Sequence, residues 1–267
     1  MRSVLDHLLS GGPARRKIAV GLHGAVWARR SLGARSDVPE MRLLDNFDLK
    51  GRVALDVGAH AGNWALSLSR RVGPSGSVLA YEALPHYGSA LSMSLRLLRV
   101  RNVKVRAVAV GERDGRASLR WRSERNELLT GRTHVELSDQ SSSSVIEVPM
   151  VTLDKDLALH GIKPSEVRFV KIDVEGAELE ALRGASILLS VGRPAVYLEL
   201  EPPWLKRMGH TVGDIFDEMA GHGYEPRLVS ESGLIPIDAD SYLAQYADRR
   251  EYNNVLFLPR MTEVPSV

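Results

Sequence analysis

The chain contains no cysteine among its 267 residues, and this absence excludes disulfide bonds, thiolate metal sites and catalysis by a thiol. It also lacks a strong excess of positive charge, because 35 lysines and arginines stand against 33 acids, for a formal charge of +2. A nucleic-acid-binding protein usually carries a much larger basic surplus. No apolar run approaches the ~20 residues that a membrane span needs. These absences predict a cytoplasmic protein with no nucleic-acid partner and no membrane span.

From residue 52 onward the sequence alternates between strand-like and helix-like segments. Short apolar runs predict the strands, and longer segments with an apolar stripe at helical spacing predict the helices between them. The predicted strands are 53–57, 77–82, 103–110, 169–176 and 195–201, with two more at 224–230 and 253–259. Such alternation is typical of βαβ units and therefore of an α/β fold with a largely parallel sheet.

The remaining segments are less regular. Residues 1–45 predict a helical extension, which could pack on the core, cap a substrate cleft or form a contact in a homodimer. We expect residues 46–267 to form a single domain, because no linker divides 52–259. Within this domain, 112–153 interrupts the alternation with an edge strand, a serine-rich loop and a further strand.

The stretch VALDVGAHAGNWAL, residues 53–66, points to a ligand. It has the pattern of a buried strand that closes on Asp56, followed by Gly58 and Gly62 and then by the start of a helix. A helix start offers free N–H groups to a polar or anionic group, and the glycines let that group approach the backbone closely. Glu82 ends the next strand, about twenty residues on, where an acid is placed to accept both hydroxyls of a ribose.

A dinucleotide does not fit this stretch. The G-x-G-x-x-G fingerprint fails because His60 and Asn63 stand where the later glycines belong, and Asp56 would repel a pyrophosphate. S-adenosylmethionine fits better, since it carries an ammonium, a sulfonium and a ribose but no phosphate. In this interpretation Asp56 faces the methionine end and Glu82 holds the sugar, unless Asp56 is only a helix-capping or turn acid. Trp64 belongs either to the core or to the wall of the cofactor pocket.

A second group of polar residues lies in the segment FVKIDVEGAELE. Period two places Lys171 and Asp173 on one side of a strand, with Glu175 at its end. If the next predicted strand is adjacent, it brings Glu199 and Glu201 to the same edge. Three interpretations stay open. A carboxylate or Lys171 could act as general base on an acceptor hydroxyl, carboxylates could hold Mg²⁺, or the lysine and the acids could form an internal salt-bridge network. The Mg²⁺ ligands would be Asp173, Glu199 and Glu201.

Five motifs follow one another in the chain, namely VALDVGAHAGNWAL, VLAYEALP, VRAVAVGERDG, VPMVTLD and FVKIDVEGAELEALRGA. Together they resemble the FkbM-type family of S-adenosylmethionine-dependent methyltransferases, from about residue 50 to residue 205. The resemblance implies a class I methyltransferase fold, with a Rossmann-like sheet of seven mostly parallel strands, an antiparallel last strand and helices on both faces. It also implies O-methylation of hydroxyls, often on sugars or macrolide-type natural products.

The resemblance and the local sequence together assign the site residues by position. The expected cofactor contacts are Asp56, Gly58, Ala59, His60, Asn63, Trp64, Glu82, Ala83, Val110, Gly111 and Asp173, with 109–112 bordering the adenine. The catalytic candidates are Lys171, Asp173, Glu175 and Glu199. The chain departs from the family at three positions, where the family usually has asparagine for His60, proline for Ala83 and histidine for Glu201.

The leading hypothesis is an O-methyltransferase that acts on a hydroxyl of a saccharide or of a glycosylated or polyketide-type metabolite. Its partner would be a small-molecule or oligosaccharide substrate. Trp121, Trp204 and Tyr197 could stack on a sugar or could belong to the core. Two other functions are weighed beside it, a nicotinamide-dependent oxidoreductase and a binding module that keeps the cofactor fold without turnover.

Overall fold

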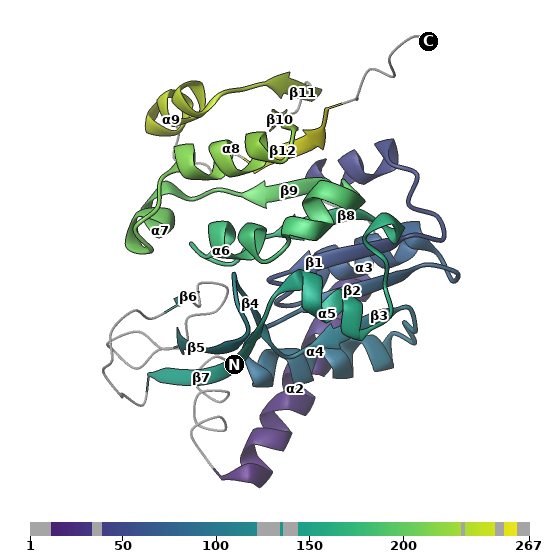
Figure 1. Ribbon diagram of the computed structural model, residues 1–267. Coiled ribbons are helices and arrows are strands. Elements are labelled where there is room, and N and C mark those ends of the chain that lie inside the picture. Colours follow the sequence, from purple (N-terminus) through teal and green to yellow (C-terminus); the bar gives the residue numbers. More distant parts are fainter. Residues whose placement is uncertain are drawn as a thin grey trace.

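A central sheet of eight strands organises the molecule (Figure 1). The computed structural model describes residues 12–33, 39–121, 134–135, 144–230, 233–248 and 254–260. The strands of this sheet are, in spatial order, β11 (Gly233–Pro236), β10 (Tyr224–Ser230), β12 (Asn254–Pro259), β9 (Ala195–Glu199), β8 (Val167–Ile172), β1 (Val53–Val57), β2 (Ser77–Tyr81) and β3 (Val103–Arg106). The pairs from β9 to β3 are parallel, whereas β12 is antiparallel to both of its neighbours.

This order confirms the predicted class I methyltransferase sheet with its antiparallel last strand. The expected number of seven strands is exceeded by one, because β11 pairs antiparallel with β10 and extends the edge of the sheet. The ends of two strands also differ from the prediction. Since β8 stops at Ile172 and β9 at Glu199, the acids Asp173, Glu175 and Glu201 lie beyond the strands rather than on them.

A second, smaller sheet lies beside the first and contains strands from the segment 112–153, which interrupts the alternation. Its strands are, in spatial order, β4 (Ala109–Val110), β7 (Val145–Val151), β5 (Gly115–Arg120) and β6 (His134–Val135). The prediction of one strand over 103–110 is therefore wrong, since β3 belongs to the large sheet and β4 pairs with β7 in the small one. The apolar pattern continues through this change of sheet, so hydropathy could not mark the break.

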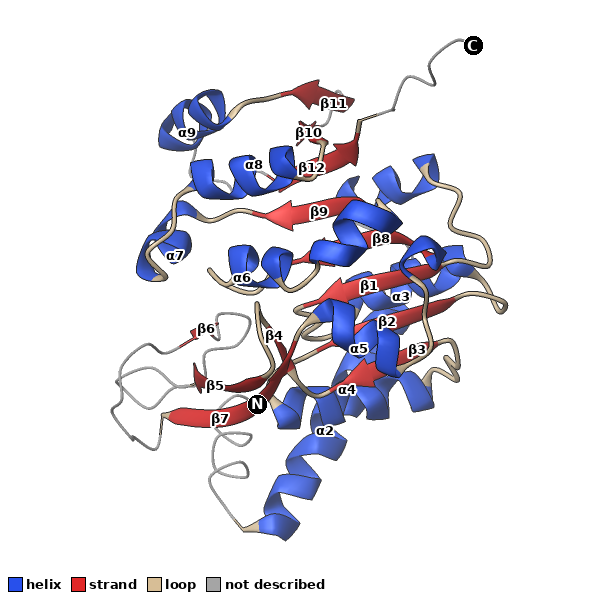
Figure 2. Ribbon diagram, in the orientation of Figure 1, coloured by secondary structure: helices blue, strands red, loops and turns tan. Residues whose placement is uncertain are grey.

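Helices cover both faces of the central sheet (Figure 2). The α-helices are α2 (Pro13–Gly33), α3 (Asn63–Val72), α4 (Pro85–Leu97), α5 (Leu153–Leu159), α6 (Glu178–Arg183), α7 (Pro202–Arg207), α8 (Val212–Gly221) and α9 (Ala239–Asp248). Shorter turns of helix are η1 (Pro39–Asn46) and η2 (Pro164–Glu166), both 3₁₀, and the π-helical η3 (Leu188–Gly192). Residues of α5, α6 and α8 form one hydrophobic cluster with the sheet, and residues of α2, α3 and α4 form another.

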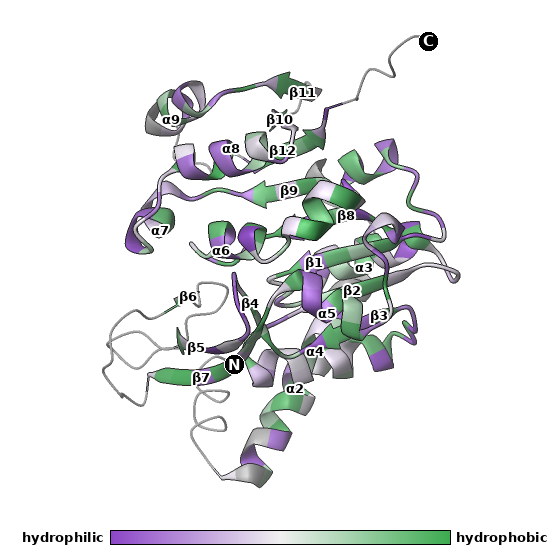
Figure 3. Ribbon diagram, in the orientation of Figure 1, coloured by the Kyte–Doolittle hydropathy of each residue, from purple (hydrophilic) through white to green (hydrophobic). Residues whose placement is uncertain are grey.

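The two clusters follow from the alternation of side chains along each strand. In β1, Leu55 and Val57 join the cluster of α5, α6 and α8, whereas Ala54 joins the cluster on the opposite face. All five residues of β1 are buried, as expected for a strand covered on both sides. Figure 3 shows largely hydrophobic central strands, whereas the helices around them mix hydrophobic and hydrophilic residues.

Local signals fix the ends of several helices. Helix α3 ends at Gly73, whose φ of 68° suits glycine. Helix α8 begins with a capping box, in which Thr211 Oγ1 accepts a hydrogen bond from the backbone N–H of Asp214 and the Asp214 carboxylate accepts one from the backbone N–H of Thr211. Both features are typical of helix ends.

The amino-terminal extension contains the long helix α2, which packs along α4. The two helices approach closely at Gly24, where a Cβ atom would lie 2.7 Å from Cβ of Met93 and 2.9 Å from the carbonyl oxygen of Ala90. The first eleven residues of the predicted extension lie outside the described residues. None of the described helices has the apolar length that a bilayer crossing requires.

Candidate functional site

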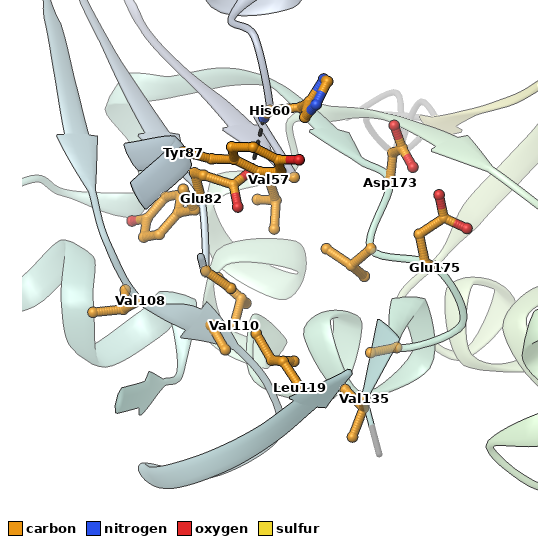
Figure 4. Close-up of a pocket in the computed structure, with 16 residues that line it drawn as sticks. Val57, His60, Glu82, Tyr87, Val108, Val110, Leu119, Val135, Asp173 and Glu175 are labelled. Carbon is orange, nitrogen blue, oxygen red and sulfur yellow. Dashed lines mark hydrogen bonds between the residues drawn. The ribbon is translucent and has the colours of Figure 1, made fainter. Parts of the chain in front are cut away.

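A cavity opens at the carboxyl ends of β1, β2 and β8, the edge of a parallel sheet at which ligands bind in folds of this type. The glycine turn after β1, the acid after β2 and the loop after β8 line its upper wall, and the small sheet lines the opposite side (Figure 4). The lining residues are Val57, Gly58, His60, Tyr81, Glu82, Ala83, Tyr87, Val108, Ala109, Val110, Leu119, Val135, Asp173, Val174, Glu175 and Ala177.

Glu82 is the buried acid of this cavity, with 8% of its surface exposed. Its Oε2 accepts a hydrogen bond of 2.9 Å from the backbone N–H of His60, and its Oε1 accepts one of 2.9 Å from the backbone N–H of Leu84. Burial raises the pKa of Glu82 to about 7, although these two backbone hydrogen bonds oppose the shift. The carboxylate is therefore held in one orientation, with its remaining lone pairs free to accept hydroxyl groups.

The glycine turn after β1 is pressed against the loop after β8. Gly58 has φ of +82°, and a Cβ atom there would lie 1.8 Å from the carbonyl oxygen of Asp173, so only glycine fits. Gly62 also has positive φ and caps α3. His60 between them has φ of +43°, a left-handed conformation that asparagine and histidine adopt more often than most residues. This conformation would also suit the asparagine that the resemblance implies at this position.

Asp56 does not line the cavity, contrary to the expected contact with the methionine end. Its side chain is fully buried beneath the turn, with Oδ1 3.6 Å from Nζ of Lys171. Burial raises the pKa of Asp56, and Lys171 opposes the shift. Because strand β1 pairs with β8, Asp56 lies directly opposite Lys171 in the sheet, and the strand register thus decides the partner of this acid.

Lys171 is also buried, and it joins three groups below the cavity. Its Nζ donates a 3.0 Å hydrogen bond to the carbonyl oxygen of Gly58 and lies 3.0 Å from Oδ2 of Asp173. Burial alone would lower the pKa of Lys171, but the charges of Asp173 and Asp56 outweigh burial and raise it. A lysine that stays protonated cannot remove a proton, so the geometry favours the salt-bridge interpretation of Lys171 over its role as a general base.

The loop after β8 and the end of β9 bring several acids together. Burial, followed by the charges of Asp173 and other acids, raises the pKa of Glu175 to about 9 and that of Glu199 to about 8. Glu175 has φ of +54°, lines the cavity and has a buried Oε2 without a hydrogen-bond partner in the described residues. Glu201 adds to the negative charge around Glu175. These shifts follow from crowding like charges in a poorly hydrated place.

The predicted Mg²⁺ site is not supported. Over the described part of the chain, no three aspartates, glutamates or histidines are arranged to hold a metal ion. Oδ2 of Asp173 lies 3.0 Å from Nζ of Lys171, and the lysine compensates the charge of the carboxylate in place of a metal ion. The predicted ligands Glu199 and Glu201 contribute to the acidic surroundings of Glu175 instead.

Of the predicted cofactor contacts, six line the cavity, namely Gly58, His60, Glu82, Ala83, Val110 and Asp173. Five do not, namely Asp56, Ala59, Asn63, Trp64 and Gly111. Among these, Asn63 is exposed at the start of α3, and Trp64 packs on Phe169 and Tyr197 in the core. Of the catalytic candidates, Asp173 and Glu175 line the cavity, whereas Lys171 and Glu199 do not.

Sequence reasoning missed most of the apolar side of the cavity. Tyr87 comes from α4, Val108 from the connection between the two sheets, Leu119 from β5 and Val135 from β6. Single apolar residues carry no signal of a ligand in the sequence. Only Ala109 and Val110 fall within the segment that was expected to border an adenine.

The sequence matches a known family over more than half of its length. The profile of the methyltransferase FkbM domain matches residues 56–226, whereas a comparison with curated proteins gave no significant match. Among solved structures, methyltransferase FkbM from Methylobacillus flagellatus KT is similar, with 17% identity, a TM-score of 0.48 and coverage of 79% of this chain but only 44% of that one. This chain therefore spans less than half the length of that relative.

Two further structures are similar at low identity. A SAM-dependent methyltransferase from Aquifex aeolicus has 17% identity and a TM-score of 0.42 over 82% of this chain and 88% of its own. The O-methyltransferase from Bacillus cereus in complex with SAH has 12% identity and a TM-score of 0.46 over 97% of this chain and 92% of its own. Since the FkbM profile covers well over half of the chain and includes the turn, Glu82 and the acidic loop, the protein belongs to the FkbM methyltransferase family.

Proposed function

We propose that the protein is an S-adenosylmethionine-dependent O-methyltransferase, with the donor bound in the cavity above β1, β2 and β8. The placement of Glu82 carries this proposal. Two backbone N–H groups fix its carboxylate at the cavity wall, and a fixed carboxylate at the end of the second strand suits the two hydroxyls of a ribose. The apolar side, with Val110 and Leu119, suits the flat face of an adenine.

The charge of the cavity supports a cationic donor. Its acidic lining groups are Glu82, Asp173 and Glu175, and no lysine or arginine is among the described residues that line it. A pyrophosphate would find no positive partner there, whereas an ammonium and a sulfonium would be attracted. Asp173, beside the glycine turn, is the acid that we assign to the ammonium end.

When bound, S-adenosylmethionine supplies an electrophilic methyl group. The residues of the chain have to orient the acceptor hydroxyl and to take its proton as the oxygen bonds to the methyl carbon. We assign the proton to Glu175, whose carboxyl group lines the cavity and has an oxygen without a partner in the described structure. Its pKa of about 9 keeps most of the group protonated at pH 7, so the base would be the ionised minority, which is a stronger base than an ordinary glutamate.

The acceptor that we propose is a hydroxyl of a saccharide or of a glycosylated or polyketide-type metabolite. Trp121 and Trp204 are partly exposed, but neither lines the cavity, and their rings already contact His86 and Arg207. Tyr197 is likewise no candidate for stacking on a sugar, because it is 2% exposed and packs on Trp64 in the core.

Calorimetry with S-adenosylmethionine and with NAD tests the donor assignment. We expect the wild-type protein to bind the former and not the latter. NAD binding of comparable strength would overturn the assignment. A screen of glycans and glycosylated metabolites with methyl-labelled donor then tests turnover, and a bound donor that stays unaltered with every acceptor would favour a binding module without catalysis.

Methyl transfer is expected to be unchanged by a chelator, because the described acids around Glu175 are not arranged as metal ligands. The measurement is the rate of label transfer to an active acceptor before and after treatment with EDTA, and again after Mg²⁺ is restored. A loss of activity in EDTA that Mg²⁺ reverses would contradict this expectation.

The affinity for adenosine is expected to rise with pH. Adenosine carries the ribose but neither the ammonium nor the sulfonium, so it reports on Glu82 alone. The ionised carboxylate is the form that accepts both hydroxyls, and with a pKa of about 7 its population grows about tenfold from pH 6 to pH 8. Calorimetry should therefore give a Kd about tenfold lower at pH 8. The Glu82→Gln variant should show no such change. An equal dependence of its Kd on pH would assign the titration to another group.

A further inference from the structure

Aromatic side chains from the amino-terminal helix gather behind the glycine turn. His23 and Trp27 on α2 are 7% and 6% exposed, and their rings stack at 5.5 Å between centroids. The ring of Trp27 also lies 5.7 Å from that of Tyr87 on α4. The close contact of the two helices at Gly24 holds α2 in this position. Neither Trp27 nor His23 lines the cavity itself.

These rings enclose the side chain of His60. The centroid of His60 lies 5.4 Å from that of Trp27 and 5.1 Å from that of Tyr87, in an edge-to-face arrangement with the latter. His60 has a left-handed backbone with φ of +43°, and a residue other than glycine holds such a conformation only where its surroundings enforce it. Packing of the ring between Trp27 and Tyr87 supplies that enforcement.

The backbone of His60 in turn orients the acid of the cavity. Its N–H donates the 2.9 Å hydrogen bond to Oε2 of Glu82 that Figure 4 draws as a dashed line. A contiguous series of contacts therefore leads from Trp27 through His60 to Glu82. We propose that Trp27 is a positioning residue of the cofactor site, which fixes the left-handed turn at His60 and thereby the orientation of the Glu82 carboxylate. This inference rests on the proposed function, in which Glu82 holds the ribose.

A double-mutant cycle tests this role by calorimetry with S-adenosylmethionine. In the wild-type background, Trp27→Ala should weaken binding by roughly tenfold, the effect of misaligning one hydrogen bond to a charged group, and Trp27→Phe should restore most of the affinity. In the Glu82→Gln background, the same Trp27→Ala change should cost less than about twofold, because the acid that Trp27 positions is already gone. Phe47→Ala serves as control, since Phe47 packs on Phe169 near the start of β8, away from the cavity. It should lower the melting temperature without changing the affinity.

Each outcome decides a separate point. A wild-type protein that does not bind S-adenosylmethionine would refute the proposed function itself. Wild-type binding with an unchanged Kd in Trp27→Ala would refute the positioning role alone. Equal losses of affinity in the two Glu82 backgrounds would show that Trp27 affects binding independently of Glu82 and would refute the positioning role. Should Trp27→Ala fail to fold, Trp27→Leu takes its place in the same cycle, because it keeps apolar volume but lacks the ring.

Discussion

Replacing Glu82 with alanine is expected to weaken the binding of S-adenosylmethionine by at least about 100-fold. The carboxylate would accept two ribose hydroxyls, and a hydrogen bond to a charged group contributes about 1.5–3 kcal/mol. The substitution also leaves the backbone N–H groups of His60 and Leu84 without their present acceptor, which loosens the turn on one side and the start of α4 on the other. Calorimetry measures the Kd.

The variants around this position separate charge from shape. Glu82→Gln keeps the volume and one carbonyl acceptor, so we expect it to weaken donor binding less than Glu82→Ala does. Glu225→Ala removes a partly exposed acid on β10 that lies 2.7 Å from Arg227 and does not line the cavity, and it should leave the Kd unchanged. A Glu82→Ala protein that binds the donor within about threefold of wild type would place the ribose elsewhere.

The second large effect is on stability, where Gly58→Ala should lower the free energy of unfolding by about 4 kcal/mol. A left-handed conformation costs an L-residue about 1–2 kcal/mol, and overpacking adds about 1–3 kcal/mol. The clash is with the carbonyl of Asp173 at 1.8 Å, a backbone atom that cannot rotate aside. Relief requires the turn and the loop after β8 to move apart, so donor binding should be lost as well. Urea unfolding measures the change in stability.

Gly209→Ala is the matched control for this change. Gly209 has φ of +83°, nearly the same as the +82° of Gly58, but a Cβ atom there would meet nothing within 4 Å. It should therefore show the conformational cost alone, about 1–2 kcal/mol, with unaltered donor affinity. Equal destabilisation in the two variants would mean that the loop after β8 yields easily and that the contact at Gly58 does not hold the site together.

The ligand-binding edge of the sheet could be predicted from the sequence because its signals are local. A buried strand, a glycine turn and a helix start are contiguous in 53–66, and Glu82 follows at the spacing that a ribose acid needs. The structure places Gly58, His60 and Glu82 together as expected. The predicted α/β order was equally accessible, since each strand and helix carries its own periodicity.

What escaped prediction depends on contacts between distant segments. Asp56 pairs with Lys171 only because β1 lies beside β8 in a particular register, and a shift by one residue would have turned Asp56 to the other face. The apolar side of the cavity comes from a second sheet whose start at Ala109 no hydropathy pattern marks. The Mg²⁺ hypothesis rested on the number of acids near one edge of the sheet. In the structure, Lys171 already compensates the charge of Asp173.

The pairing of β1 with β8 also bears on how the protein is made. The two strands at the heart of the sheet are 53–57 and 167–172, so more than a hundred residues separate them along the chain. A nascent polypeptide emerges from the ribosome from its amino terminus onward, and pairings of such long range form late. Until residue 172 has left the exit tunnel, β1 lacks its neighbour on that flank. Leu55 and Val57 then also lack the partners that α6 and α8 supply in the finished core.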